Sequence, residues 1–230
     1  MEIGEIISDS VKYPTSDWTK IIILAVILII PIVNFIGIGY VIRIMKGTLA
    51  GLDDLPDFDE VGELFIDGLK LLVVGIVYAI PIWIISAILG AIIGLLSPAS
   101  TVTYMDTTST ALFATMIASY AAVFVAAIIV GLIEIVAILN MAYYDGDLGA
   151  AFRFSDILNY ISTIGWGKYI ITYIVIALIC AVIMAVAGLV GVILIGIGLI
   201  ITMPLAMSFC YMFGARAITT LFSDALGETA

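Results

Sequence analysis

The pattern in this chain that comes closest to a catalytic motif is the acidic run "DDLPD", which contains Asp53, Asp54 and Asp57. The same letters occur in enzymes that bind a diphosphate through Mg²⁺, and there the carboxylates must share one face of a helix. Pro56 lies inside the run, and proline in a helix interior costs about 3 kcal/mol and disfavours helix at the preceding residue. We therefore predict a capping role instead, with Asp57 as the cap of a helix over 57–67.

Most residue types that carry enzyme chemistry are scarce or missing. The chain has no histidine, which is the commonest general base and the commonest metal ligand. Its two cysteines, Cys180 and Cys210, both fall in apolar runs, and we interpret them as buried small hydrophobic side chains. We expect no catalytic residue, no metal ion and no cofactor, and we predict that the protein is not an enzyme.

Glu134 is the acid that lies deepest in an apolar run. It precedes Tyr143, where the run ends, by about nine residues, or ~14 Å along a helix, which is near the midplane of a ~30 Å hydrocarbon core. A charged side chain there costs at least ~2.5–3.5 kcal/mol, so such acids are functional candidates. Glu134 would bind a cation or carry a proton; alternatively, it is a neutral carboxyl group hydrogen-bonded to Asn34 or Asn140.

Two arginines end their apolar runs in matching contexts. "PIVNFIGIGYVIR" ends at Arg43, and the similar stretch "PLAMSFCYMFGAR" ends at Arg216. Either these side chains clamp a lipid phosphate, or they extend to the membrane surface and fix the topology. Arg43 and Arg216 join Glu134 and Asn34 as candidate binding residues.

The elements that must position these residues are membrane helices. The chain is 64% hydrophobic and only 11% charged, with a mean hydropathy of +1.30, whereas soluble domains are about half apolar and a quarter charged. Its net charge of −10 argues against a nucleic-acid partner. We predict an all-α integral membrane helical bundle, a single membrane domain over 1–230, with four full transmembrane helices. The predicted spans are 69–96, 111–142, 169–187 and 189–213, and the last two join at a tight turn near Gly188.

A fifth apolar run, 21–42, is broken by Pro31. It either crosses the membrane once with a kink, as a fifth span, or re-enters as a hairpin that turns at the proline. The stretch "WTKIII" at Trp18 resembles "WGKYII" at Trp166, so this part of the chain resembles the last predicted helix pair with its middle removed. That similarity favours re-entry, with both ends on the cytoplasmic side.

Positive charge predicts the orientation. Lysine and arginine gather in loops 43–70 and 143–168 and in the tail, whereas loop 97–110 has none. The two basic loops and the C-terminus are therefore expected to be cytoplasmic. Amphipathic segments are predicted to lie on the membrane surface as helices, two of them on the cytoplasmic side. They are 2–12, 57–67 and 155–163, the last two being cytoplasmic and acidic.

Several stretches, among them "GYVIRIMKG", "LPDFDEVGELFIDGLK" and "FGARAI", resemble domain-of-unknown-function family 4013 over nearly the whole chain. The resemblance implies an archaeal multi-pass protein of the cell membrane, and it implies no activity. A weaker resemblance to YciC-like bacterial inner-membrane proteins, which have a six-span core and an inside N-terminus, supports re-entry of the segment 21–42.

Two classes of function fit these features. The first is a non-enzymatic scaffold, assembly or envelope-homeostasis component of the lipid bilayer, with a protein partner docked on the acidic cytoplasmic surface helices. The second is a transporter or channel for a small solute, ion or lipid that uses Glu134. A water-accessible cavity reaching Glu134 would favour the second, and a dry bundle would favour the first.

Overall fold

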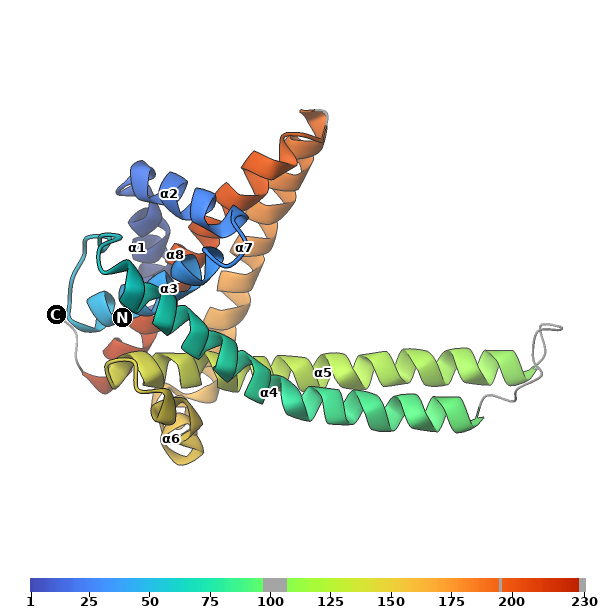
Figure 1. The fold of residues 1–230 in the computed structure, drawn as a ribbon. Helices are drawn as coiled ribbons and strands as arrows, with labels where there is room; N and C mark the ends of the chain where they lie inside the picture. The colour runs from blue at the N-terminus through green and yellow to red at the C-terminus, as the bar shows by residue number, and fades with distance from the viewer. Residues whose placement is uncertain (97–106, 195, 228–230) are drawn as a thin grey trace. The chain divides into compact units, whose positions relative to one another are not determined.

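The computed structural model describes residues 1–96, 107–194 and 196–227, and all regular structure in them is helical (Figure 1). Four of the helices are long and apolar enough to cross a membrane, which confirms the predicted helical membrane fold and defines a multi-pass protein. They are α4 (Val61–Leu96), α5 (Thr107–Tyr143), α7 (Trp166–Ile193) and α8 (Leu199–Leu226). Helices suit this setting because each satisfies its backbone hydrogen bonds internally.

The helices divide into two compact units. The first comprises 1–72 and 136–230, and the second comprises 73–135. The single membrane domain over 1–230 stays a prediction. Besides α7, α8 and the ends of α4 and α5, the first unit holds shorter elements. They are α1 (Ile3–Thr15), α2 (Trp18–Ile29), α3 (Asn34–Leu49), the 3-10 helix η1 (Leu148–Phe152) and α6 (Phe154–Ile164).

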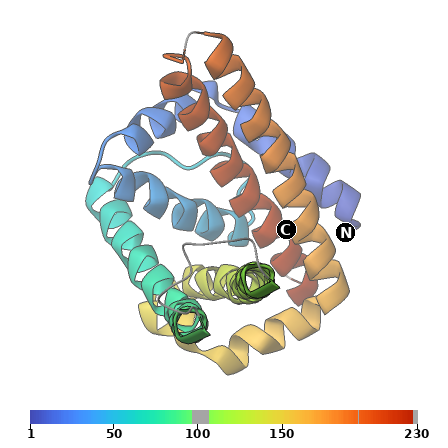
Figure 2. The same cartoon turned by 90° about the vertical axis from the view of Figure 1, so that its right-hand side faces the viewer.

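Helix α8 is the centre of the first unit. It packs against α1, α2, α3, α6 and α7, and Figure 2 shows it running beside α7. Phe213, Leu221 and Phe222 of α8 are fully buried, as is Tyr40 of α3. The amino group of Met1 pairs with Asp224 of α8 at 2.6 Å, so the start of α1 lies beside the end of α8.

The segment 21–42 forms two helices rather than one. Helices α2 and α3 are separated by a turn that includes Pro31 and Ile32, whose φ of 71° is left-handed. Gly37 of α3 faces α2, where a Cβ on it would lie 3.0 Å from the side chains of Leu24 and Leu28. Of the two alternatives, a single kinked helix and a hairpin, the structure thus has the hairpin. Its re-entry into the bilayer stays a prediction.

The start of α4 differs from the sequence-based prediction. The predicted helices 57–67 and 69–96 are one continuous helix that begins at Val61. The predicted cap at Asp57 is wrong, because residues 52–60 are not helical and the Asp57 carboxylate pairs with Lys20 at 2.8 Å. The left-handed φ of 47° at Glu60 sets the later start.

The turn between α7 and α8 also falls later than predicted. Helix α7 continues through Gly188 to Ile193, so the predicted tight turn near Gly188 is wrong. A glycine inside a helix costs only about 1 kcal/mol, which the packing of α7 on α8 can offset. The glycines that permit the reversal are Gly191, where a Cβ would lie 2.9 Å from the Leu199 Cα, and Gly198, where it would lie 2.9 Å from the Gly191 oxygen.

The second unit consists of the remaining parts of α4 and α5, which lie side by side (Figures 1 and 2). Between them is a groove of 190 Å³ with an apolar lining that includes Gly90, Met116 and Tyr120. Most of the predicted outside loop 97–110 lies beyond the described residues.

Candidate functional site: an acidic strap held by the helices of the first unit

The most unusual local structure in the first unit is the segment Leu52–Asp59, which we call the strap. It has no regular secondary structure, and it connects α3 to α4. A non-helical backbone must find hydrogen-bond partners outside itself. In the strap these partners are side chains of other helices.

Carbonyl groups along the whole strap accept hydrogen bonds from arginine, lysine and tyrosine side chains of α1, α2, α3 and α8. The bonds are Arg216 Nη1 to Leu52 O (2.7 Å), Tyr13 Oη to Asp54 O (3.3 Å), Lys20 Nζ to Leu55 O (2.6 Å), Tyr40 Oη to Pro56 O (2.6 Å), and Arg43 Nη1 to Asp57 O (3.1 Å) and Asp59 O (2.6 Å). The strap therefore ties four helices together through its backbone.

Arg216 holds the first half of the strap from inside. Its side chain is only 9% exposed, and Nη2 donates to the Asp53 carboxylate at 2.6 Å. Nε lies 3.4 Å from the Asp9 carboxylate of α1, and the guanidinium group sits 4.9 Å from the centre of the Tyr13 ring. Burial raises the pKa of the Tyr13 hydroxyl to about 12, so this hydroxyl stays protonated and donates to the strap.

Arg43 holds the second half of the strap. It pairs with Asp59, with Glu60 at 3.4 Å and with Glu63 at 3.6 Å, and its side chain is 16% exposed. The internal match between the stretches ending at Arg43 and Arg216 thus has a structural counterpart. Both arginines, which the sequence marked as candidate lipid-phosphate ligands, bind protein oxygen atoms at the two ends of one strap.

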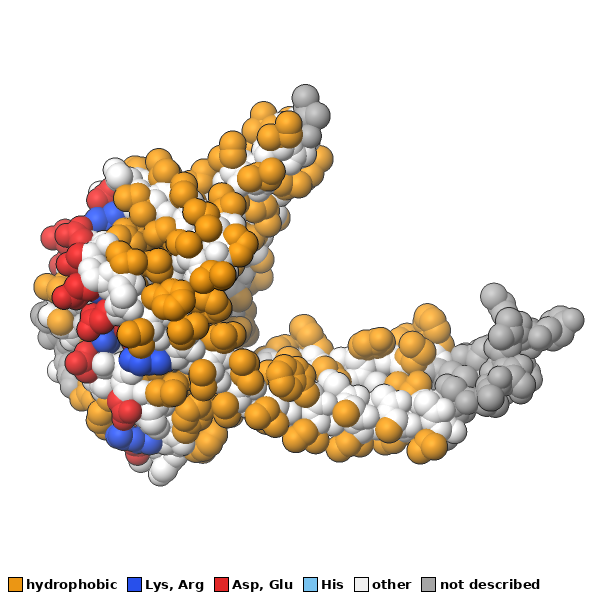
Figure 3. All heavy atoms as spheres, in the orientation of Figure 1, with side chains coloured by type: hydrophobic (Ala, Val, Ile, Leu, Met, Phe, Trp, Pro, Cys, Tyr) orange, Lys and Arg blue, Asp and Glu red, His pale blue; other side chains and the backbone are white. Residues whose placement is uncertain are grey.

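While the strap carbonyls point to the helices, its carboxylates face outward. The side chains of Asp53, Asp57 and Asp59 are 89%, 79% and 71% exposed, and red acidic atoms gather on this face of the first unit in Figure 3. A hydrogen bond from Lys20 holds the pKa of Asp57 below its usual range, so the carboxylate is ionised.

The carboxylates of "DDLPD" do not converge on one point. Asp53 pairs with Arg216 of α8 and Asp57 pairs with Lys20 of α2. Within the described parts of the chain, no group of three or more acidic, cysteine or histidine side chains is placed to hold a metal ion. The sequence pattern of a diphosphate site therefore has no matching geometry here.

A second cluster of charges joins α3, α4 and the end of α5. The Asp67 carboxylate, 11% exposed, lies 2.7 Å from Lys70 and 3.7 Å from Lys46, and Lys46 also reaches Asp145 at 3.0 Å. Gly146 fits beside this cluster with a left-handed φ of 82°. Sequence reasoning used the two lysines as a signal of orientation and missed that they pair with these acids.

Two of the predicted site residues lie away from the strap. Glu134 belongs to the second unit, where its carboxylate would lie 3.5 Å from a Cβ on Gly75 of α4, next to Tyr78. Asn34 belongs to the first unit, at the start of α3, and its Oδ1 is buried without a hydrogen-bond partner in the described structure. The amide of Asn140 donates instead to the Ala150 carbonyl at 2.8 Å, and its predicted bond with Glu134 stays a prediction.

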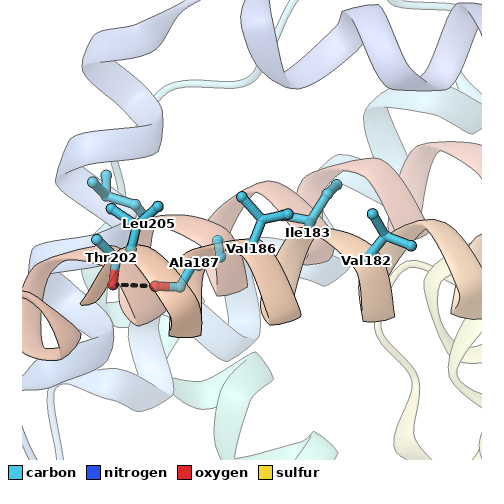
Figure 4. A pocket seen from close by; sticks show the side chains of 8 residues that line it. Val182, Ile183, Val186, Ala187, Thr202 and Leu205 are labelled. Carbon is cyan, nitrogen blue, oxygen red and sulfur yellow. Dashed lines mark hydrogen bonds between the residues drawn. The ribbon is translucent and has the colours of Figure 1, made fainter. Parts of the chain in front are cut away.

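A larger groove, of 410 Å³, runs along α7 and α8. Figure 4 shows its lining as aliphatic side chains, among them Val182, Val186 and Leu205. Its polar group, the Thr202 hydroxyl, donates to the Ala187 carbonyl at 2.8 Å and is thereby turned into the helix pair. The groove offers contact to hydrocarbon and no group for chemistry.

The long apolar helices and the charged strap define a multi-pass helical membrane protein with one polar surface on its first unit. Over residues 22–212 the chain matches the model of the family described as "Protein of unknown function (DUF4013)". The match covers most of the chain, so the protein belongs to this family, as its motifs predicted. No curated protein matches the chain, and no solved structure does.

Proposed function

We propose that the protein is a non-enzymatic scaffold, assembly or envelope-homeostasis component of the cell membrane that docks a protein partner on the acidic strap. The observation that supports this most is that the backbone and the side chains of the strap have different partners. Its backbone is bound by side chains of α1, α2, α3 and α8, while its carboxylates are presented to solvent.

A surface fixed in this way favours binding. A segment that is already ordered loses little conformational freedom when a partner arrives, so more of the contact energy remains as affinity. The outward acids favour a basic polypeptide and disfavour anionic lipid headgroups, because complementary charge guides association and like charge opposes it. On the predicted topology, this partner is cytoplasmic.

Photo-crosslinking in cells tests this proposal. A crosslinking amino acid at Asp54, whose carbonyl rather than its carboxylate binds Tyr13, is expected to capture a protein, and the yield should fall in high salt. The matched control is Asp145, an acid of the same unit that is 96% exposed. A lipid adduct at 54, or equal protein adducts at both positions, would contradict a docking role.

A second candidate function, transport of a proton or small cation, is supported by the position of Glu134. The missing side chain of Gly75 leaves room beside the carboxylate within the second unit. The described groove of that unit is lined by residues other than Glu134, such as Ser86 and Ser119, so the groove does not itself support a water path to Glu134.

Glu134→Gln separates the two functions. If Glu134 carries protons, proteoliposomes with a trapped pH dye should lose proton flux at least ~10-fold in this variant, because an amide cannot exchange the proton. Glu134→Asp keeps a titratable group and should retain partial flux. Wild-type vesicles that are no faster than empty ones would remove proton transport as a candidate and leave the docking proposal intact.

A further inference from the structure

The two cysteines of the chain meet in the structure. Cys180 lies on α7 and Cys210 on α8, thirty residues later. The Cys210 thiol is directed at the Cys180 carbonyl, with a distance of 4.0 Å between Sγ and oxygen, so the two cysteines are neighbours where α7 packs on α8. The sequence interpretation of both as buried small hydrophobic side chains is incomplete, because both are half-buried and they are neighbours across the two helices.

Helices α7 and α8 hold the thiols in place. They pack along their length, and both belong to the first unit. Close to the turn, the Thr202 hydroxyl of α8 bonds to the Ala187 carbonyl of α7 at 2.8 Å, and Gly191 and Gly198 allow the backbones to touch. A disulfide usually joins Cα atoms about 4.4–6.8 Å apart, a spacing that tightly packed helices can supply where two cysteines are neighbours.

We propose that Cys180 and Cys210 form a redox modification site that takes a lipid-soluble quinone as its oxidant. The two S–H bonds break and one S–S bond forms between α7 and α8. Two electrons and two protons pass to the quinone, which leaves as the quinol. A quinone fits because both thiols lie in candidate membrane spans, and the nearby groove along the same helix pair is lined by aliphatic side chains.

The test is oxidation of the purified full-length protein in lipid nanodiscs with decylubiquinone, followed by capping of free thiols with N-ethylmaleimide. Cyanogen bromide cuts after methionine, so it separates the thiols into fragments 142–184 and 208–212. The expected product is one linked pair of these fragments, which dithiothreitol returns to the two free fragments. Both thiols should disappear together, because each crosslink consumes the two.

The matched control moves one thiol by half a helical turn. Cys180→Ala combined with Leu178→Cys places a thiol on a side of α7 where Leu178 is 61% exposed, and this protein should give at least tenfold less linked product. Linked product at the wild-type yield in this variant would overturn the proposal. So would wild-type protein that keeps both thiols in the quinone, or that crosslinks only between molecules.

Discussion

Arg216→Ala is expected to lower the free energy of unfolding by about 3 kcal/mol, the range for breaking a buried charge pair or several charged hydrogen bonds. The side chain is 9% exposed and binds the Leu52 carbonyl and the carboxylates of Asp53 and Asp9. Removing it leaves the Leu52 carbonyl without its donor and frees the first half of the strap. The measurement is a denaturant titration in detergent micelles.

Arg153→Ala is the matched control for charge removal. Arg153 is 44% exposed and pairs with Asp147 at 3.1 Å, so its loss should cost less than ~1 kcal/mol, as for surface pairs in general. Equal effects of the two variants would show that Arg216 acts only as a surface charge. Because the docking proposal needs an ordered strap, Arg216→Ala should also reduce crosslinking from position 54.

Gly68→Ala should be among the most damaging single-methyl changes in the first unit. A Cβ on Gly68 of α4 would overlap the carbonyl oxygen of Phe35 and lie 2.7 Å from its carbonyl carbon, and Gly39 of α3 meets α4 just as closely from the other side. The obstacle is backbone, which cannot rotate away, so we expect a cost of ~3 kcal/mol or more, at the upper end for overpacked sites. Loss of the monodisperse peak in size-exclusion chromatography would report it.

Gly62→Ala tests whether the effect belongs to packing. Gly62 lies on the same helix, and nothing approaches its Cβ position within 4 Å. Alanine there should stabilise by roughly 0.5–1 kcal/mol, since it only restricts the unfolded chain. If Gly62→Ala were as harmful as Gly68→Ala, the close approach of α3 and α4 would not explain the effect, because alanine favours the helix more than glycine does.

Much of the fold follows from local features of the sequence. A membrane-spanning helix is recognised by the length and composition of one continuous run. Helices α4, α5 and α7 contain predicted spans, and α8 overlaps the fourth one, 189–213, from Leu199 onward. The break at Pro31 also followed from the sequence, because proline removes a backbone donor and disfavours a helix interior. The rule is not absolute, since Pro81 and Pro204 stand inside α4 and α8. The family, too, was recognisable from short motifs, and the match over 22–212 confirms it.

Helix boundaries were less readable where charges pair across the fold. Asp67 and Lys70 looked like the polar edge between a surface helix and a span, yet α4 runs through both without a break. The charge of the Asp67 carboxylate is compensated by Lys46 on α3, so this acid can lie within a continuous helix. Similarly, Asp57 had the sequence pattern of a helix cap, but in the structure its carboxylate pairs with Lys20 of α2.

The sequence by itself determined that this is a helical membrane protein, since hydrophobicity and length act within one segment. Tertiary structure alone decided what its polar residues do. The strap depends on donors such as Tyr13 and Arg216, which lie far apart in the chain, and the thiols of Cys180 and Cys210 meet only because α7 and α8 pack together. Such contacts depend on how helices pack, and no spacing within a single run encodes them.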